Sequence, residues 1–464
     1  MPRDNRMGDM ETSDRSVAES LAHRIAALDA ARLPAAVRDT CERLLVDVIG
    51  LCVVARRTDY VNASLAAWTD AGPATAIGHP QRLSAASAAF VNGTATHGED
   101  FDDTFEGGPV HAGAVIVPAV LAAAEQEHLH GQQALLGIAI GVETICRLSL
   151  VVPKAVHKAG FHPTAVFGAV AAAAGVGAAL RLDARQLANA LGIAGSMASG
   201  IIEYLADGSS TKRMHAGWAA QSGLRAALLA RGGFTGPRTV FEGVHGLFNA
   251  FAHTRAGDYG ALVDDFGQRW LAPTLAFKAY PCGTMVQPYV DCALRLRSQG
   301  IAPEDVAEML CEVGEGTVHR LWEPLARKQR PPNGYAAKFA TAYCIAAAFV
   351  TGSLGLDAFT DAAVADPVVR ALAARVRHRI DPANPYPQSY TGHIRVTLRT
   401  GRVLEARQPH LRGGAREPLT RAELEDKFAR NACAGGWPQT RLAEALALAR
   451  TLFDRPVDLH AFSG

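Results

Sequence analysis

Apolar residues at helical spacing fill most of the first 270 positions of this 464-residue chain. One helix opens near Pro34 and places Leu44, Val48 and Ile49 on one face, and residues 135–145 predict another. We find no convincing strand pattern before residue 270. A chain half of this kind can only bury its apolar faces by packing helix on helix.

The pattern changes after residue 271. Residues 309–319 alternate between apolar and polar, and residues 394–398 and 403–406 flank a turn that contains Gly401, which predicts a β-hairpin. An Ala-rich helix is expected over residues 338–351, and helix returns over residues 420–453.

The predicted fold is therefore mainly α. After a polar tail (1–16), both chain ends (17–270 and 407–464) build a large all-helical domain, and a smaller α+β domain (271–406) is inserted into it. The balance of 46 basic and 45 acidic residues argues against a nucleic-acid partner, because phosphate binding needs clustered positive charge.

Eight cysteines occur without a CxxC pair or zinc-ligand spacing, which fits a reducing cytoplasm and predicts no iron–sulfur or zinc site. The polar N-terminus shows no signal-peptide pattern. The weakly polar run 163–180 has membrane-spanning length, but its Ala and Gly residues favour a buried, closely packed helix. We expect a cytoplasmic protein that does not enter a membrane.

The acidic segment 98–104 (GEDFDDT) lies between the apolar runs 85–96 and 112–124, with His111 at the head of the second run. Aspartates are costly to bury without partners, and an acidic loop between buried helices is typical of a pocket floor. The alternative is a solvated helix cap. Asp100 and His111 are candidate catalytic residues.

His162 precedes Pro163 at the start of the Ala/Gly-rich run. Proline favours the first helical turn, so His162 is expected at the positive helix end, where the dipole lowers the pKa of the imidazole. A neutral imidazole can act as a general base. The alternative is a histidine that caps the helix by bonding to its backbone.

The loop 208–217 (GSSTKRMHAG) enters an Ala-rich helix. Its backbone N–H groups and Lys212 suit a carboxylate, and His215 lies in the same first turn. The Walker order of a phosphate loop is absent. A basic surface turn is the alternative.

Lys278 lies between Phe277 and Tyr280, where the α+β domain begins. We expect it to be partly desolvated at a cleft, with snorkelling to solvent as the alternative. Tyr343, in the Ala-rich helix, is either catalytic or a core tyrosine whose hydroxyl has a partner.

Taken together, these segments resemble the MmgE/PrpD family, which includes 2-methylcitrate dehydratase, cis-aconitate decarboxylase and iminodisuccinate epimerase. The resemblance spans nearly the whole chain. It rests on five ordered blocks, at residues 97–104, 160–164, 211–217, 278–282 and 337–343.

The resemblance implies a helical domain with an α+β lid, a cytoplasmic homodimer, and a cleft that binds a di- or tricarboxylate without a cofactor or metal. Matched by motif, the residues expected to line this cleft are Asp100, Thr104, His111, His162, Lys212, Lys278 and Tyr343, and we add His215 as a substrate-binding candidate. The absence of a GxGxxG motif after a strand also disfavours a nicotinamide or flavin.

Proton abstraction next to a carboxylate needs cations at the carboxylate oxygens, for which Lys212 and Lys278 are candidates. The leading hypothesis is a hydro-lyase of the dehydratase type acting on a hydroxy di- or tricarboxylate. An epimerase, a decarboxylase and a catalytically silent carboxylate-binding protein are the alternatives.

Two departures from the family pattern bear on the substrate. Relatives often carry Cys or His directly after the position of Cys282, where this chain has Gly283, so this wall is less cationic and disfavours tricarboxylates and cis-aconitate decarboxylation. Ala112 replaces a more usual Pro, and Glu106 adds a carboxylate before His111. Glu106, with the aspartates of 100–103, is also a possible divalent-ion site.

Overall fold

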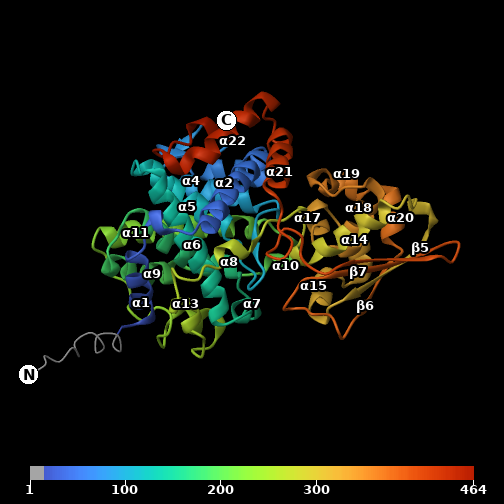
Figure 1. Cartoon of the computed structure of the whole chain (residues 1–464), viewed down its shortest axis with the longest axis horizontal. Helices are drawn as coiled ribbons and strands as arrows, with labels where there is room; N and C mark the ends of the chain where they lie inside the picture. The colour runs from blue at the N-terminus through green and yellow to red at the C-terminus, as the bar shows by residue number, and fades with distance from the viewer. Residues whose placement is uncertain (1–14) are drawn as a thin grey trace, which may run out of the picture. The chain divides into compact units, whose positions relative to one another are not determined.

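A computed structural model describes residues 15–464, so the predicted tail lies almost wholly outside the described residues. The chain forms two compact units (Figure 1). The helical unit comprises, of the described residues, 15–98, 107–275 and 421–464, and the mixed unit comprises Glu99–Glu106 and Ala276–Thr420. Helices greatly outnumber strands, which confirms the mainly α fold class.

The helical unit is built from helices of very different lengths, with one small sheet. Its helices are α1 (Val17–Ala26), α2 (Ala35–Ala55), α3 (Asp59–Ala67), α4 (Ala85–His97), α5 (Gly113–Gln126), α6 (Gly131–Val151), α7 (Ala155–Lys158), α8 (Pro163–Ala179), α9 (Ala184–Met197), α10 (Tyr204–Asp207), α11 (Thr211–Arg231), α12 (Leu247–Ala252), α13 (Gly260–Val263), α21 (Arg421–Ala434) and α22 (Gln439–Thr451). Strands β1 (Ala71–Thr75) and β2 (Arg82–Leu83) pair antiparallel.

Helix α8 is the centre of the helical unit. Every residue of α8 is buried, and the helix packs against α6 on one side and α11 on another. Small residues allow this approach: a Cβ at Gly137 would lie 2.7 Å from the carbonyl oxygen of Gly175, and a Cβ at Gly175 would meet that of Gly137 at the same distance. The Ala/Gly-rich run is thus a closely packed core helix, as predicted.

Helix α6 (Gly131–Val151) is the one helix of residues 15–464 that is long and apolar enough to cross a membrane. Of its most apolar 18-residue window, 94% is buried inside the protein. Its apolar surface is thus already covered by protein, as in a core helix.

The mixed unit contains a four-stranded sheet in the order β6-β5-β7-β8. Strands β5 and β6 are parallel, whereas β7 is antiparallel to both β5 and β8. The predicted hairpin is present as β7 and β8, and Gly401 in its turn has φ of 85°. The strands are β3 (Thr104–Phe105), β5 (Val306–Val313), β6 (Val376–Ile380), β7 (Gly392–Leu398) and β8 (Val403–Gln408), and β4 (Leu275–Ala276) lies where the chain enters the unit.

Helices of the mixed unit share one apolar core with the sheet, in which α14 packs against β7 and β8. They are α14 (Gln287–Arg297), α15 (Val318–Leu321), α16 (Leu325–Gln329), α17 (Gly334–Ala337), α18 (Thr341–Thr351), α19 (Asp361–Val364) and α20 (Pro367–Ala373).

The structure differs from the sequence predictions in four places. The expectation of no strand before residue 270 is wrong, because β1, β2 and β3 are short strands of mostly small residues that carry little β pattern. The helix expected over 338–351 begins only at Thr341, after the separate helix α17. Residues 407–420 and the acidic segment Glu99–Glu106 belong to the mixed unit. The first segment is tied there by backbone bonds, such as Phe277 N to Gly413 O at 3.0 Å, and the second by the side chains of Lys278 and Lys338.

The close approach of α6 and α8 predicts that Gly175→Ala destabilises the protein. Alanine raises helix propensity by about 1 kcal/mol, but the new methyl group forces the two helices apart at a cost of roughly 1–3 kcal/mol. Chemical denaturation should show a lower midpoint. The control is Gly232→Ala at the end of α11, where the nearest atom lies 3.4 Å away. Equal midpoints for the two variants would contradict the packing argument.

Candidate functional site

The eight predicted site residues divide equally between the two units. His111, His162, Lys212 and His215 belong to the helical unit, and Asp100, Thr104, Lys278 and Tyr343 belong to the mixed unit. Each set is described within its own unit.

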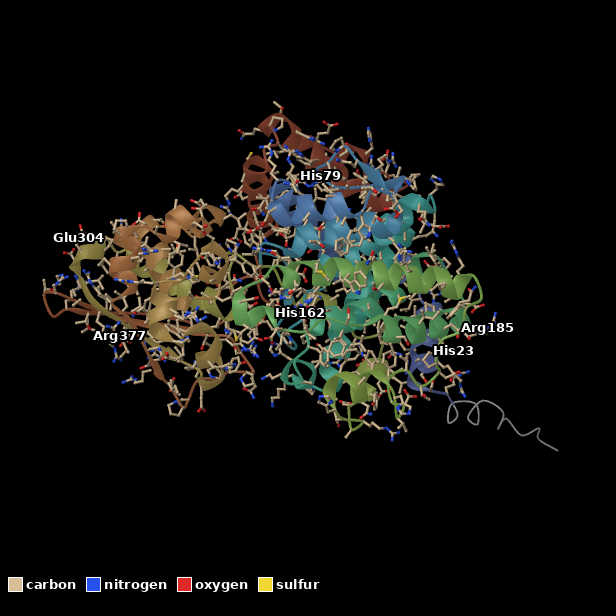
Figure 2. The ribbon with its side chains drawn as sticks, turned by 180° about the vertical axis from the view of Figure 1, so that it is seen from behind. His23, His79, His162, Arg185, Glu304 and Arg377 are labelled. Carbon is tan, nitrogen blue, oxygen red and sulfur yellow. The ribbon has the colours of Figure 1, made fainter. Side chains whose placement is uncertain are left out.

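Four histidines meet at helix ends of the helical unit, and we call them the histidine cluster. His97 ends α4, His111 precedes α5, His162 precedes α8, and His215 lies in the first turn or so of α11. The His97 ring centroid lies 4.8 Å from that of His111 and 5.6 Å from that of His162. The His162 and His215 centroids are 5.3 Å apart. The histidines predicted separately as candidates therefore lie together in one cluster, of which Figure 2 labels His162.

Burial favours the uncharged forms of His162 and His215. The pKa of His162 lies well below its usual value, first because the ring is buried and then because His97, Lys212, His215 and His111 carry or acquire like charge. Burial, with His97 and Lys212, lowers the pKa of His215 to about 4. The predicted direction at His162 is confirmed, but burial is its main cause rather than the helix dipole.

The ring of His162 bonds to another side chain and not to its own helix. Its Nδ1 lies 3.1 Å from Nδ1 of His215, and the ring makes no capping hydrogen bond to α8. The alternative of a backbone-capping histidine is therefore wrong. His111 is anchored through its backbone, whose N–H donates to Oγ1 of Thr164 at 3.1 Å. Within one helical turn of Pro163, α8 thus orients two members of the cluster.

Lys212 is the cation beside the cluster. Its side chain is buried in the first turn of α11, and its charge lowers the pKa of both His162 and His215. The neighbouring Arg213 is used differently: its Nε donates to the carbonyl oxygen of Gly98, and its guanidinium covers the ring of Tyr60. Of these two adjacent cations, Lys212 is therefore the one whose charge lowers the pKa of the cluster histidines His162 and His215. A buried positive charge of this kind suits a carboxylate.

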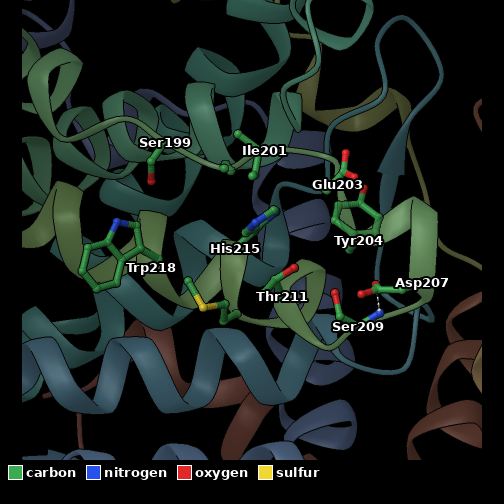
Figure 3. Close-up of a pocket in the computed structure, with 12 residues that line it drawn as sticks. Ser199, Ile201, Glu203, Tyr204, Asp207, Ser209, Thr211, His215 and Trp218 are labelled. Carbon is green, nitrogen blue, oxygen red and sulfur yellow. Dashed lines mark hydrogen bonds between the residues drawn. The ribbon is translucent and has the colours of Figure 1, made fainter.

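A pocket of about 380 Å³ opens on the His215 side of the cluster (Figure 3). Its lining includes Tyr204, whose ring lies 5.8 Å from that of His215. Its acidic lining residues are Glu203 and Asp207, and Asp207 is engaged with the backbone N–H of Ser209 at 2.8 Å. Because this lining is acidic, the pocket favours water and cations over an anionic substrate.

In the mixed unit, two buried lysines hold the start of the acidic segment. Nζ of Lys278 donates to the carbonyl oxygen of Asp100 at 2.9 Å and to its Oδ1 at 2.7 Å. Nζ of Lys338 contacts Glu99 in the same way, at 2.7 Å to the carbonyl oxygen and 2.9 Å to Oε2. Asp100 has φ of 56°, a left-handed conformation that such bonds stabilise. Lys278 is thus buried as expected, but its charge is balanced by Asp100.

The other residues predicted in the mixed unit are also buried. Thr104 lies in β3, and Tyr343 donates its hydroxyl to the carbonyl oxygen of Ala358 inside the apolar core. That bond agrees with the core interpretation of Tyr343, and its contact with substrate stays a prediction. Glu106 accepts from the backbone N–H of Ala415 at 3.3 Å, and burial raises its pKa.

Two of the four metal ligands suggested in the acidic segment are engaged by other protein groups. Asp100 and Glu106, two of the suggested ligands, are occupied by Lys278 and by the Ala415 backbone. In the helical unit, His97 and His111 each offer a ring nitrogen to a possible metal ion. A metal-free reaction stays a prediction.

Sequence reasoning missed three residues that the structure places beside predicted ones: His97, Tyr204 and Lys338. His97 had a usable signal, since it ends the apolar run directly before the acidic segment. Tyr204 had none, because a four-residue helix carries no periodic pattern.

Comparison with known proteins agrees with this arrangement. The sequence model of the MmgE/PrpD N-terminal domain matches residues 19–258, and that of the MmgE/PrpD C-terminal domain matches residues 280–449. The chain belongs to the MmgE/PrpD family. The resemblance inferred from the five blocks is thereby confirmed.

Curated relatives of this MmgE/PrpD protein include named enzymes. Cis-aconitate decarboxylase of Mus musculus is 29% identical over 432 residues, covering 90% of this chain and 87% of the relative. The Homo sapiens enzyme of the same name is 28% identical over 429 residues, covering 90% and 88%. Cis-aconitate decarboxylase of Aspergillus terreus is 26% identical over 449 residues, covering 89% and 88%. This similarity supports an enzyme of the lyase type.

The buried pair of Lys278 and Asp100 predicts a large loss of stability for Lys278→Met. Removing one partner leaves an uncompensated buried charge, at a cost of about 3–5 kcal/mol. The double variant with Asp100→Asn should recover much of this loss, because Asn tolerates the left-handed conformation. Urea unfolding measures both. As a control, Arg231→Met removes a partly exposed ion pair with Glu127, expected to contribute about 0–1 kcal/mol. Equal losses for the two single variants would contradict the argument.

The lowered pKa of His215 predicts a pH-dependent stability. In the unfolded chain the imidazole titrates near 6.5, and in the folded protein at about 4. As the pH falls through this window, the unfolded state takes up the proton first. The free energy of unfolding, and with it the stability, therefore decreases by roughly 1 kcal/mol per pH unit. In His215→Asn, the denaturant midpoint of unfolding should depend less on pH between pH 6.5 and 4 than in the parent protein. An unchanged slope would show that His215 titrates normally.

Proposed function

We propose that this protein is a lyase that decarboxylates a small polycarboxylate of the cis-aconitate type, without a cofactor. The observation that carries the proposal is the buried histidine cluster, in which the pKa values of His162 and His215 are lowered, beside the buried cation of Lys212. The printed activity of the mouse, human and Aspergillus terreus relatives supports the choice of reaction.

The reaction breaks the bond between a carbon and one carboxylate. Carbon dioxide leaves, and the electron pair stays on the carbon, where a second carboxylate delocalises it. In this proposal Lys212 stabilises that growing negative charge on the carboxylate oxygens, in a site where burial strengthens the attraction. His162 then donates a proton to the carbon. One proton is consumed for each carbon dioxide released.

Dehydration of a hydroxy di- or tricarboxylate is the second candidate function. The same cluster serves it, since a neutral imidazole is ready to take a proton from the carbon next to a carboxylate. The small Gly283 in place of a functional side chain favours this reaction over decarboxylation of a tricarboxylate. Contributions from Asp100, Thr104, Lys278 and Tyr343, a homodimer and a cytoplasmic location also stay predictions.

A proton NMR assay in D₂O distinguishes the reactions. We expect one acid of a panel of cis-aconitate, citrate, 2-methylcitrate, malate-type hydroxy acids and iminodisuccinate to lose carbon dioxide and gain one deuterium on carbon. Loss of water would indicate the dehydratase, and deuteration without other change would indicate an epimerase. Binding without any bond change would contradict both proposed functions.

Variants test the assigned roles. Lys212→Met should lower kcat/KM by about 10²-fold or more, as when one preorganised group stabilising an oxyanion is lost. The matched control is Lys158→Met, an exposed lysine at the end of α7, which should keep the activity of the parent. Full activity of Lys212→Met would overturn the assignment.

A further inference from the structure

We propose that His215 and His162 form a proton relay that carries solvent protons from the pocket to the reacting carbon. The inference rests on the proposed decarboxylation and adds to it the route by which the consumed proton arrives. His215 was expected only to bind substrate, so the relay assigns it a different task.

The two rings are placed in series. His215 lines the pocket of about 380 Å³, whereas His162 does not. The Nδ1 atoms of the two rings lie 3.1 Å apart, within hydrogen-bond distance. Two facing Nδ1 atoms share a single proton, because a bond needs a donor on one side and a lone pair on the other. In the proposed relay, Nε2 of His215 then exchanges protons with pocket water, and Nε2 of His162 serves the reacting carbon.

The surroundings of the rings favour a relay through neutral forms. Both rings are buried, and Lys212 and His97 oppose additional positive charge on either of them. An imidazolium held in this cluster would be costly. Tyr204 packs against both rings, with centroids 6.3 Å from His162 and 5.8 Å from His215, which limits their rotation. Glu203 and Asp207 in the pocket lining attract hydronium at its outer end.

The relay conserves protons and charge at each ring. In the resting state Nε2 of His162 and Nδ1 of His215 carry protons. When carbon dioxide leaves, Nε2–H of His162 protonates the carbon, Nδ1–H of His215 passes to Nδ1 of His162, and Nε2 of His215 takes a proton from pocket water. Both rings end neutral in the opposite tautomer. A reversal of the two tautomers through solvent restores the resting state.

The first test uses His215→Ala in the full-length protein, with the acid of the panel that the parent turns over. Loss of the group that passes protons to His162 should lower kcat by about 10²-fold with little change in KM, since acid–base catalysis contributes at least that factor. Added imidazole should enter the enlarged pocket and restore at least a tenth of the parental kcat. Added 1-methylimidazole, which lacks a second exchangeable nitrogen, should not. His23→Ala, an exposed histidine on α1, is the control and should match the parent.

An unchanged kcat in His215→Ala would overturn the relay. So would a loss that imidazole does not repair, because that result indicates a merely structural role.

The second test does not depend on turnover. Nitrogen-15 NMR of the unliganded protein should show one Nδ1–H among His162 and His215, and its signal should disappear in both His162→Asn and His215→Asn but persist in His23→Ala. Two bare Nδ1 atoms would overturn the relay. If no acid of the panel reacts with the parent protein, the proposed function fails while this measurement still decides the relay.

Discussion

The close packing of α8 against α6 and α11 is the constraint on which the site of the helical unit depends. Three helices of this length can approach backbone to backbone only where glycine and alanine face each other, as Gly137 and Gly175 do. The start of α8 carries His162, and the first turn of α11 carries Lys212 and His215. A larger residue in this contact would move the helix ends apart, and His162 would then lie farther from Lys212 and His215.

That packing also sets the charge of the site. His162 and His215 lie at tightly packed helix ends where they lose their water, so their neutral forms are favoured, and the nearby charge of Lys212 reinforces the effect. In the mixed unit, buried groups keep their charge: Asp100 and Lys278 are both buried, and the charge of each balances that of the other. One unit thus keeps its reactive groups neutral by burial, and the other keeps charged groups by pairing them.

Much of this was predictable from the sequence, and the failures have physical causes. Periodicity located α2, α8 and the β7–β8 hairpin, because long or strongly alternating segments carry a clear pattern. The direction of the His162 pKa followed from its position, but its main cause did not, since burial depends on helices distant in the chain. The partner of Lys278 was equally hidden: nothing local to residue 278 indicates that it contacts Asp100.

The stoichiometry of protons separates the two candidate reactions. Dehydration takes one proton from carbon and gives one to the departing hydroxide, so a closed pair of groups at the substrate suffices. Decarboxylation ends with one more C–H bond than the site itself can supply, and each turnover needs a proton from solvent. A buried histidine bonded to a second histidine that borders a pocket meets that need and is superfluous for dehydration. On this ground the arrangement of His162 and His215 favours decarboxylation, even though Gly283 favours the dehydratase.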